Sequence, residues 1–282
     1  MSSEFEKLAE TEFISVNDSG DEKIRAHKLL KDEHAPVLVL VLGLNSNSLA
    51  WDDFLLYMNK SYSVYVIETR EKKATITTNK TTFHQDNFAS DIAKAINYWG
   101  LEHYILFASS MGAAFTLHAL TKDLIKPDRI YLIGPVLRLE APKFAIYAGM
   151  LITKCSWRFF LKPFAKFYIR NFHTQRDQKE QSEKYIGYLE NVEPTRARKT
   201  TKGLKNFLIT EDELRKIKRK CILIGAEKDK AHHASITRHI HSVLEDSEYY
   251  DLGDNISAHS LPLAQLAEEL EEKYKKGETI GH

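Results

Sequence analysis

The sequence predicts an α/β protein with a doubly wound, mostly parallel β-sheet flanked by helices and interrupted by an inserted helical lid. Three observations support this fold class. Short apolar runs alternate along the chain with helical patterns, which is typical of βαβ units. The run VLVLVL at 37–42 is apolar at every position, as expected for a parallel strand covered on both faces. About 80 residues after Pro135 then pass without a strand pattern.

Each element follows from its local pattern. The predicted strands are Val37–Leu42, Ser63–Glu68, Tyr104–Ser109, Arg129–Gly134, Lys220–Gly225 and Glu248–Leu252. The predicted helices are Trp51–Lys60, Asp86–Trp99, Gly112–Lys122, Ala234–Leu244 and Leu263–Lys275. Gly100 follows the second of these helices, where a C-terminal capping glycine is favoured. Near the start, Thr11–Val16 and Lys23–Leu30 flank the turn sequence NDSG, which predicts an antiparallel hairpin ahead of the parallel strands.

The chain length and these patterns predict how the chain is divided. At 282 residues the chain is long enough for a single hydrophobic core without disulfides or a metal. We expect residues 1–135 and 220–282 to form that core, and residues 136–219 to form a helical cap or lid. The cap is basic, because residues 141–205 hold 14 Lys/Arg and five Asp/Glu in a chain of net charge +1.

Cysteine content and hydropathy predict a cytoplasmic protein. Of the two cysteines, Cys221 opens an apolar run and is expected to be a buried thiol, whereas disulfides are typical of oxidising compartments. The N-terminal residues are acidic and lack the basic and apolar regions of a secretory signal. The longest uncharged apolar run, Phe144–Ile152, is far shorter than the ~20 residues that span a bilayer.

The most specific motif is FASSMG at 107–112, which joins a predicted strand directly to a predicted helix. A serine on such a strained turn can act as a nucleophile, provided that the residues two places away on either side are small. Ala108 and Gly112 meet this condition around Ser110, whereas Phe107 and Met111 around Ser109 do not. Ser110 is therefore the candidate nucleophile. The alternative is a serine that merely caps the following helix.

A serine nucleophile needs a base, and position must select it among the 12 histidines. His259 follows the last strand and precedes the last helix, so we predict that it is the base. His232 and His233 are rivals that begin a helix and are expected to face solvent. His118 lies inside a helix and is expected to be a packed histidine.

The base in turn needs a carboxylate that fixes its tautomer and stabilises its cation. Asp229 follows the strand Lys220–Gly225, at the sheet edge where open α/β folds build their sites. We predict that Asp229 orients the base, with Glu227 as the alternative.

The oxyanion of an acyl-transfer reaction needs preorganised hydrogen-bond donors. The residue after the nucleophile, Met111, offers its backbone N–H at a helix start. The second donor is expected from the loop GLNSNS after Leu42, and we predict the backbone N–H of Leu44. Asn45 and Ser46 either assist or form a turn.

Together these residues resemble the α/β-hydrolase fold family. The chain order Ser110, Asp229, His259 matches the family's serine–acid–histidine order, and Leu42-Gly43-Leu44 is similar to its His-Gly-x oxyanion loop with leucine in place of histidine. Glu68-Thr69-Arg70 resembles the family's Asp-x-Arg, but Glu71, Lys72 and Lys73 stand where glycines usually follow. The resemblance covers about residues 10–135 and 220–275. It implies a serine esterase or lipase-like enzyme with a cap, and serine at the nucleophile position argues against the chemistry of relatives that carry aspartate there.

The predicted lid suggests both a substrate class and a partner. Phe144, Tyr147, Met150 and Leu151 are candidates for lining a lipophilic substrate pocket. Their basic neighbours suggest either solvated lysines on a cap helix or transient contact with an anionic membrane surface. Nucleic-acid binding is not expected, because the basic residues are interleaved with a hydrophobic segment and no recognition motif is present.

The predicted function is hydrolysis of a carboxylic ester through an acyl-enzyme, with a small-molecule lipophilic acyl ester as substrate. The same catalytic groups would serve an acyl-thioesterase or an acyltransferase, so a thioester substrate stays open. A non-catalytic binding protein with a hydrolase fold is the remaining alternative. The sequence shows no metal-ligand cluster and no phosphate-binding glycine loop, so neither a cofactor nor a metal is expected.

Overall fold

The computed structural model describes residues 3–139, 143–169, 186–187, 189, 192–229 and 232–277. Its centre is an eight-stranded sheet with the order β1-β2-β4-β3-β5-β6-β7-β8. β1 pairs antiparallel with β2, β2 pairs antiparallel with β4, and the remaining neighbours are parallel. The strands are β1 Glu10–Ser15, β2 Lys23–Leu29, β3 Val37–Val41, β4 Ser63–Ile67, β5 Ile105–Ser109, β6 Arg129–Ile133, β7 Cys221–Gly225 and β8 Ser247–Asp251.

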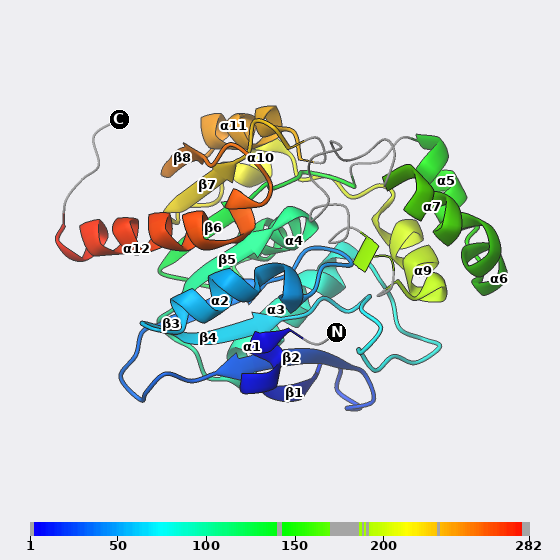
Figure 1. Ribbon diagram of the computed structural model, residues 1–282, viewed down its shortest axis with the longest axis horizontal. Helices are drawn as coiled ribbons and strands as arrows, with labels where there is room; N and C mark the ends of the chain where they lie inside the picture. Colours follow the sequence, from blue (N-terminus) through cyan, green and yellow to red (C-terminus); the bar gives the residue numbers. More distant parts are fainter. Residues whose placement is uncertain are drawn as a thin grey trace.

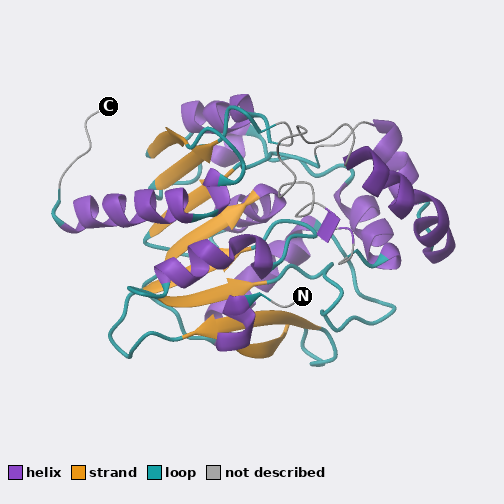
Figure 2. Cartoon of the chain, viewed as in Figure 1, coloured by secondary structure: helices purple, strands orange, loops and turns teal. Residues whose placement is uncertain are grey.

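Helices cover both faces of this sheet, as Figures 1 and 2 show. One face packs against α3 (Gln85–Tyr98), α4 (Ser110–Thr121) and α11 (Ala234–Val243). The other face packs against α1 (Glu4–Leu8), the 3₁₀ turn η1 (Ser48–Trp51), α2 (Asp52–Met58) and α12 (Leu261–Lys275). A further 3₁₀ turn, η4 (Ser257–His259), precedes α12. The predicted doubly wound fold class is therefore confirmed.

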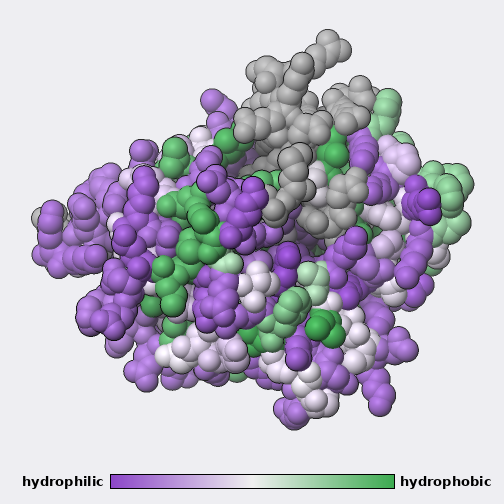
Figure 3. Space-filling view, turned by 60° about the horizontal axis from the view of Figure 1, so that its bottom comes forward, coloured by the Kyte–Doolittle hydropathy of each residue, from purple (hydrophilic) through white to green (hydrophobic). Residues whose placement is uncertain are grey.

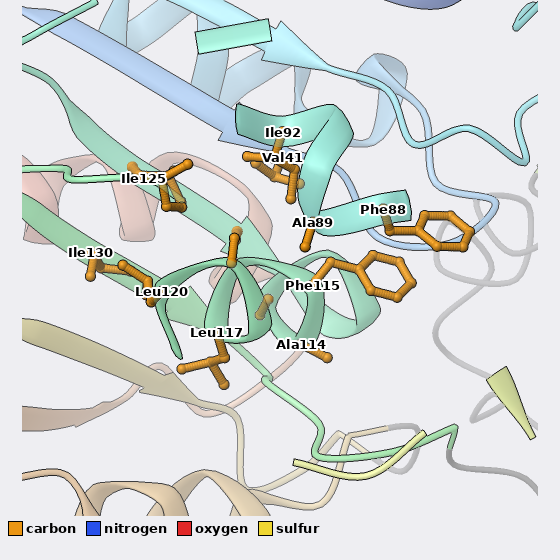
Figure 4. Close-up of a cluster of buried hydrophobic side chains, with 14 of the residues drawn as sticks. Val41, Phe88, Ala89, Ile92, Ala114, Phe115, Leu117, Leu120, Ile125 and Ile130 are labelled. Carbon is orange, nitrogen blue, oxygen red and sulfur yellow. The ribbon is translucent and has the colours of Figure 1, made fainter. Parts of the chain in front are cut away.

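The sheet supports two hydrophobic cores because successive side chains of a strand point to opposite faces. In β3, Val39 and Val41 point toward α3 and α4, whereas Leu38 and Leu40 point toward α2 and α12. On the first face, Phe115 of α4 stacks on Phe88 of α3 with ring centroids 4.1 Å apart (Figure 4). Figure 4 also shows Ile92 of α3 beside Val41 of β3, so α3 and α4 are both packed onto the strands that lead to the site.

The described residues between β6 and β7 are mainly helical. They form α5 (Lys143–Met150), α6 (Lys154–Ser156), the π-helical turn η2 (Trp157–Leu161), α7 (Lys162–Tyr168), α9 (Pro194–Leu204) and α10 (Glu211–Leu214). In Figure 1, α5, α6, α7 and α9 lie on the right, the side toward which the parallel strands point. Among the described residues, no helix is both long and apolar enough to cross a bilayer.

The predicted strands agree with the observed ones to within two residues at either end. Helix α1 was not predicted, and it is held by a contact distant in sequence. The backbone N–H groups of Glu4 and Phe5 donate to the Asp52 carboxylate, at 2.9 and 3.1 Å, and the Phe5 side chain is fully buried. Such a short helix has little intrinsic stability, so tertiary contacts that the local sequence does not reveal fix it.

A buried charge cluster around Glu68 makes the stability of the fold sensitive to acid. Glu68 is 1 % exposed and accepts hydrogen bonds from Arg25 Nε and Nη2 at 3.1 and 2.6 Å. Burial raises the pKa of this carboxyl, but the neighbouring His27 side chain and the hydrogen bonds and charge of Arg25 outweigh burial and lower the pKa to about 2. His27 Nε2 lies 3.7 Å from Glu68 Oε1, which is too far for a hydrogen bond.

Candidate active site

Ser110 lies at the junction of β5 and α4, with a backbone φ of +52°. A non-glycine residue rarely adopts this left-handed conformation, and where it does the strain commonly serves a site. The tight packing around the turn explains the small residues predicted for it. A Cβ at Gly112 would lie 2.6 Å from the carbonyl oxygen of Leu42, so α4 can approach β3 this closely because residue 112 has no side chain.

The Ser110 hydroxyl is hydrogen-bonded to His232, whose ring is hydrogen-bonded to Asp229. Ser110 Oγ lies 2.9 Å from His232 Nε2, and His232 Nδ1 lies 2.9 Å from Asp229 Oδ2. With its proton on Nδ1, the imidazole donates to the carboxylate and leaves Nε2 to accept the hydroxyl proton. The side chains of His232 and Asp229 are 21 % and 4 % exposed. Low exposure strengthens the electrostatic support that Asp229 gives to a protonated ring.

The loop after β7 brings the acid and the histidine together. The Asp229 N–H donates to the Ala226 carbonyl oxygen at 2.9 Å, which turns the chain directly after the strand. His232 follows three residues later, just before α11. Gly134 at the end of β6 leaves room for it, because a Cβ there would lie 3.1 Å from His232 Cβ. The interpretation that His232 faces solvent is therefore wrong.

His259 lies near the same carboxylate but has different described contacts. Its Nδ1 donates to the Asn255 carbonyl oxygen at 2.7 Å, and its ring packs edge-on against Trp51 with centroids 4.6 Å apart. The Asn255 side chain donates to Asp229 Oδ2 at 2.7 Å, so Asn255 joins the two. In the structure the histidine hydrogen-bonded to Ser110 is therefore His232, whereas the sequence analysis expected His259.

His118 and His233 lie where the sequence analysis placed them, whereas Glu227, the alternative acid, lies away from the Ser110–His232 hydrogen bond. His118 is 6 % exposed, with Nε2 2.7 Å from Asp86 Oδ1, and is a packed histidine. His233 is exposed at the start of α11. Glu227 pairs with Arg238 at the surface, and its side chain is 50 % exposed. Position along the chain thus placed His118 and His233 outside the site, but it left Glu227 as the alternative to Asp229 and favoured His259 over His232.

The predicted oxyanion donors lie on segments that touch the nucleophile turn. A Cβ at Gly43 would lie 3.3 Å from Ser110 Cβ, so the loop after β3 passes directly over the serine. Leu44 follows Gly43, and Met111 follows Ser110. Within the described residues, no group accepts a hydrogen bond from the backbone N–H of either residue. Their assignment as oxyanion donors stays a prediction.

A buried ion pair holds the loop Gly43–Asn45, which we call the oxyanion loop. Lys72 Nζ donates to Gly43 O at 2.7 Å, Thr69 Oγ1 at 2.9 Å and Glu71 Oε1 at 3.0 Å. The same Glu71 oxygen accepts the Asn45 N–H at 3.0 Å. The side chains of Glu71 and Lys72 are 3 % and 5 % exposed. The two residues therefore fix the backbone on both sides of Leu44, and Asn45 is held with φ at +58°.

Lys72 also borders a cavity and contacts the helical segment between β6 and β7. A cavity of about 390 Å³ lies beside the loop and is lined by Arg25, Ser46, Asn47, Glu68, Lys72, Lys73 and Ala74. Its mainly polar and charged lining differs from the lipophilic pocket expected from the sequence. From α9, Arg196 Nη1 donates to the Lys72 carbonyl oxygen, so the insertion is tied to the oxyanion loop.

The predicted pocket residues of the insertion lie on or just after α5. Tyr147 and Leu151 are 64 % and 76 % exposed, and Met150 is half-buried. Phe144 belongs to α5, but its side chain lies outside the described residues. High exposure does not support Tyr147 and Leu151 as walls of a closed pocket. Close packing of α5 on α9 sets their direction, because a Cβ at Gly149 would lie 3.2 Å from the Thr201 side chain.

One set of side chains in the described residues could be compared with a metal site. Ligand atoms of Glu6, His27 and Glu68 lie within 4.8 Å of one another. The Arg25 guanidinium already occupies this position, with Nη2 2.6 Å from Glu68 Oε1 and 3.9 Å from Glu6 Oε1. A positive side chain neutralises the carboxylates, so we interpret the set as a structural charge cluster.

The sequence analysis considered His232 as a rival base but favoured His259 as the partner of Ser110. The signal that could have found it is the spacing Asp229-x-x-His232 directly after a buried strand, because a tight turn can bring side chains three residues apart to one edge. The arrangement as a whole offers a hydroxyl, a ring nitrogen that can take its proton, a carboxylate behind the ring and two backbone donors. These are the parts needed for nucleophilic attack on a carbonyl group.

Comparisons with known proteins identify the fold. No protein-family model matches the chain. An N-formylmaleamate deformylase from Pseudomonas putida is 25 % identical over 123 residues, which cover 44 % of this chain and 46 % of that protein. The chain thus matches less than half the length of this curated relative.

Solved structures match over almost the whole chain. A hydrolase from Pseudomonas aeruginosa PA01 has a TM-score of 0.77 at 13 % identity, over 93 % of this chain and 97 % of the other. A thermophilic esterase from Thermogutta terrifontis has 0.75 at 16 %, over 96 % and 100 %. An enol-lactonase from Burkholderia xenovorans LB400 has 0.74 at 14 %, over 94 % and 100 %. The chain therefore has the fold shared by these hydrolases, the α/β-hydrolase fold.

Proposed function

We propose that this α/β-hydrolase-fold protein is a serine hydrolase that cleaves a carboxylic ester through an acyl-enzyme intermediate. Ser110 is the nucleophile, His232 the base and Asp229 the residue that orients and stabilises the base. The observation that carries the proposal is the continuous hydrogen-bonded chain from Ser110 Oγ through His232 to Asp229. Its position at the strained turn after β5, next to two available backbone donors, supports the same conclusion.

The reaction follows from these contacts. His232 Nε2 takes the Ser110 proton as Oγ attacks the ester carbonyl carbon, and the carbonyl oxygen becomes an oxyanion held by the N–H groups of Leu44 and Met111. The protonated ring then donates its proton to the departing alkoxide, which leaves Ser110 acylated. Water enters, gives a proton to His232 and attacks the acyl carbon. Collapse of the second tetrahedral intermediate returns the proton to Ser110 and releases the acid.

The substrate class is proposed from the chemistry of the site and from the relatives. Every group in the mechanism acts on the acyl carbon, so esters and thioesters share the same oxyanion. The solved structures with this fold include an esterase and an enol-lactonase, whose names describe cleavage of ester bonds. These names favour a small acyl ester for this chain. The Pseudomonas putida deformylase, which this chain matches over less than half of its length, adds N-formylmaleamate as a compound to test.

Covalent labelling tests whether the site is catalytic. The purified protein is treated with a fluorophosphonate, and the modified peptide is identified by mass spectrometry. We expect labelling on Ser110, none in Ser110→Ala, and continued labelling in Ser109→Ala if that variant is folded. Absence of an adduct on folded wild-type protein would favour the non-catalytic binding alternative. Turnover of p-nitrophenyl esters, matching acyl-thioesters and N-formylmaleamate then distinguishes the substrate classes.

Three histidine variants test which ring is the base. We expect His232→Ala to lower kcat for a p-nitrophenyl ester by about 10⁴-fold or more, because Ser110 would lose its proton acceptor. His259→Ala should lower kcat by less than about tenfold, since its ring supports Asn255 rather than the hydroxyl. His233→Ala, on the neighbouring exposed residue, is the control. A severe loss in His259→Ala with near wild-type activity in His232→Ala would reassign the base to His259.

A further inference from the structure

The helical segment from Lys154 to Tyr168, formed by α6, η2 and α7, exposes aromatic side chains on its outer face. Phe159, Phe160, Phe164 and Phe167 are 62 %, 71 %, 65 % and 58 % exposed. A helix on the surface of a globular protein normally turns its apolar stripe inward. These four phenylalanines lie within nine consecutive residues, so they form a patch rather than scattered single residues. Contiguous exposed patches of this kind mark interaction sites.

The inner face of the segment is apolar as well. Trp157, Leu161 and Ala165 are half-buried and follow one another at four-residue intervals, which places them on one side of the helix. The segment therefore carries apolar side chains on a half-buried side as well as on its exposed side. Its exposed rings would be stabilised by a second apolar environment that covers them.

Cations accompany the aromatic residues throughout the segment. Lys154, Arg158, Lys162 and Lys166 also recur every four residues, and this spacing places them along one ridge beside the phenylalanines. From residue 141 to residue 176 the sequence contains seven Lys/Arg and neither Asp nor Glu. A surface that combines aromatic rings with a net positive charge is complementary to an anionic lipid interface. Rings insert at the headgroup level there, and basic side chains extend to the phosphates.

A second copy of the chain fits this surface less well. A symmetric dimer through the segment would place the same patch on both sides, and each basic ridge would then face another. Within residues 141–176 neither copy could supply a carboxylate. An anionic bilayer meets both requirements at once, since it solvates the rings and neutralises the cations.

We propose that the segment Lys154–Tyr168 docks the protein on the surface of an anionic lipid bilayer. Figure 1 shows α6 and α7 at the outer right-hand side of the molecule, and Figure 3 shows hydrophobic residues at the same edge. Docking there leaves the sheet and its helices in water, because the contact uses the outer face of the insertion. The inference concerns binding and is independent of the proposed hydrolase reaction.

Vesicle sedimentation of the full chain tests this inference. The probes are vesicles of phosphatidylcholine alone and of equal parts phosphatidylcholine and phosphatidylglycerol. We expect binding to the anionic vesicles, weaker binding at high salt, and little binding to the neutral ones. Phe160→Ser/Phe164→Ser should weaken anionic-vesicle binding by about tenfold or more, because apolar insertion is lost. Tyr98→Ser is the matched control, since Tyr98 is 59 % exposed at the end of α3.

A charge variant and a solution measurement complete the test. Lys154→Glu/Arg158→Glu should also lower anionic-vesicle binding, whereas the exposed control Lys122→Glu should not. Circular dichroism confirms that each variant is folded, which is expected because the replaced rings are exposed. Equal binding by wild type and the Phe160→Ser/Phe164→Ser variant would overturn the proposal. So would dimerisation in ultracentrifugation without lipid that the same variant abolishes, since the patch would then join two copies.

Discussion

Replacement of Lys72 by methionine tests whether the buried Glu71–Lys72 pair positions the oxyanion loop. The lysine Nζ is the donor in three hydrogen bonds, one of them to Gly43 O at 2.7 Å. Methionine keeps most of the side-chain volume but leaves the Glu71 carboxylate, 3 % exposed, without its cation. Removing one partner of a buried pair costs about 3–5 kcal/mol of unfolding free energy. Urea denaturation should show a loss of this size.

The same variant should change catalysis in a specific way. Leu44 lies between Gly43 and Asn45, the two residues that the pair holds. If the loop relaxes and the Leu44 N–H is misplaced, kcat should fall by about 10²–10³-fold, the cost of one oxyanion donor. KM should change little, because the oxyanion exists only in the transition state and intermediates. The assay is steady-state hydrolysis of a p-nitrophenyl ester at a temperature where denaturation data show the variant folded.

Two further variants make the reasoning refutable. Glu71→Gln/Lys72→Met removes both charges and should recover part of the lost stability, because no buried charge is left unpaired. Lys73→Met alters the adjacent exposed lysine and should change neither stability nor kcat appreciably. If Lys72→Met kept the kcat of Lys73→Met while losing stability, the pair would be structural only. Equal values for both variants in both assays would refute the buried-pair argument entirely.

Three further predictions use single sites. Asp229→Asn should lower kcat by about 10⁴-fold, because the amide favours the wrong imidazole tautomer, whereas Glu227→Gln should behave as wild type in the same ester assay. Since burial, His27 and Arg25 together leave Glu68 with a pKa of about 2, against 4.5 for the free group, its ionised form contributes about 3 kcal/mol of unfolding free energy above pH 5. That contribution is lost as the pH falls toward 2, and urea denaturation of wild type and Glu68→Gln should converge there. Burial raises the Cys221 pKa to about 12, so a disulfide reagent should titrate one thiol, the exposed Cys155, in folded protein and two after unfolding.

The sheet was predictable because its signals are local. Val37–Val41 and Cys221–Gly225 are apolar at every position, and strands buried on both faces need no partner information to be recognised. Helix α1 has only a local cap from Ser3, whose side chain accepts from the Glu6 N–H, and the Asp52 carboxylate holds it from 47 residues or more away. The domain division at 136–219 stays a prediction, although the described residues there are mainly helical.

The nucleophile turn was predictable because its signal is also local. The Glu71–Lys72 pair that holds the oxyanion loop was not predictable. Ser110 is identified by its immediate neighbours, which must be small for α4 to approach the Leu42 carbonyl group. Glu71 and Lys72 occupy a segment where the resembling family usually has glycines, and no local pattern indicates that both side chains are buried. Their role depends on a lysine side chain that reaches a carbonyl group 29 residues earlier. Contacts of that kind are set by the packing of two loops, which periodicity does not encode.

The choice of base shows where position along the chain ceases to be informative. His232 and His259 both follow strands that end at the same edge of the sheet, and both serine–acid–histidine orders are the same. Their ring contacts differ: Nδ1 of His232 faces a carboxylate, whereas Nδ1 of His259 faces a main-chain carbonyl oxygen. A carboxylate stabilises a protonated imidazole more strongly than a neutral carbonyl group does. The ring that receives the serine proton must carry positive charge in the transition state, so the contacts favour His232 even though both rings lie near Asp229.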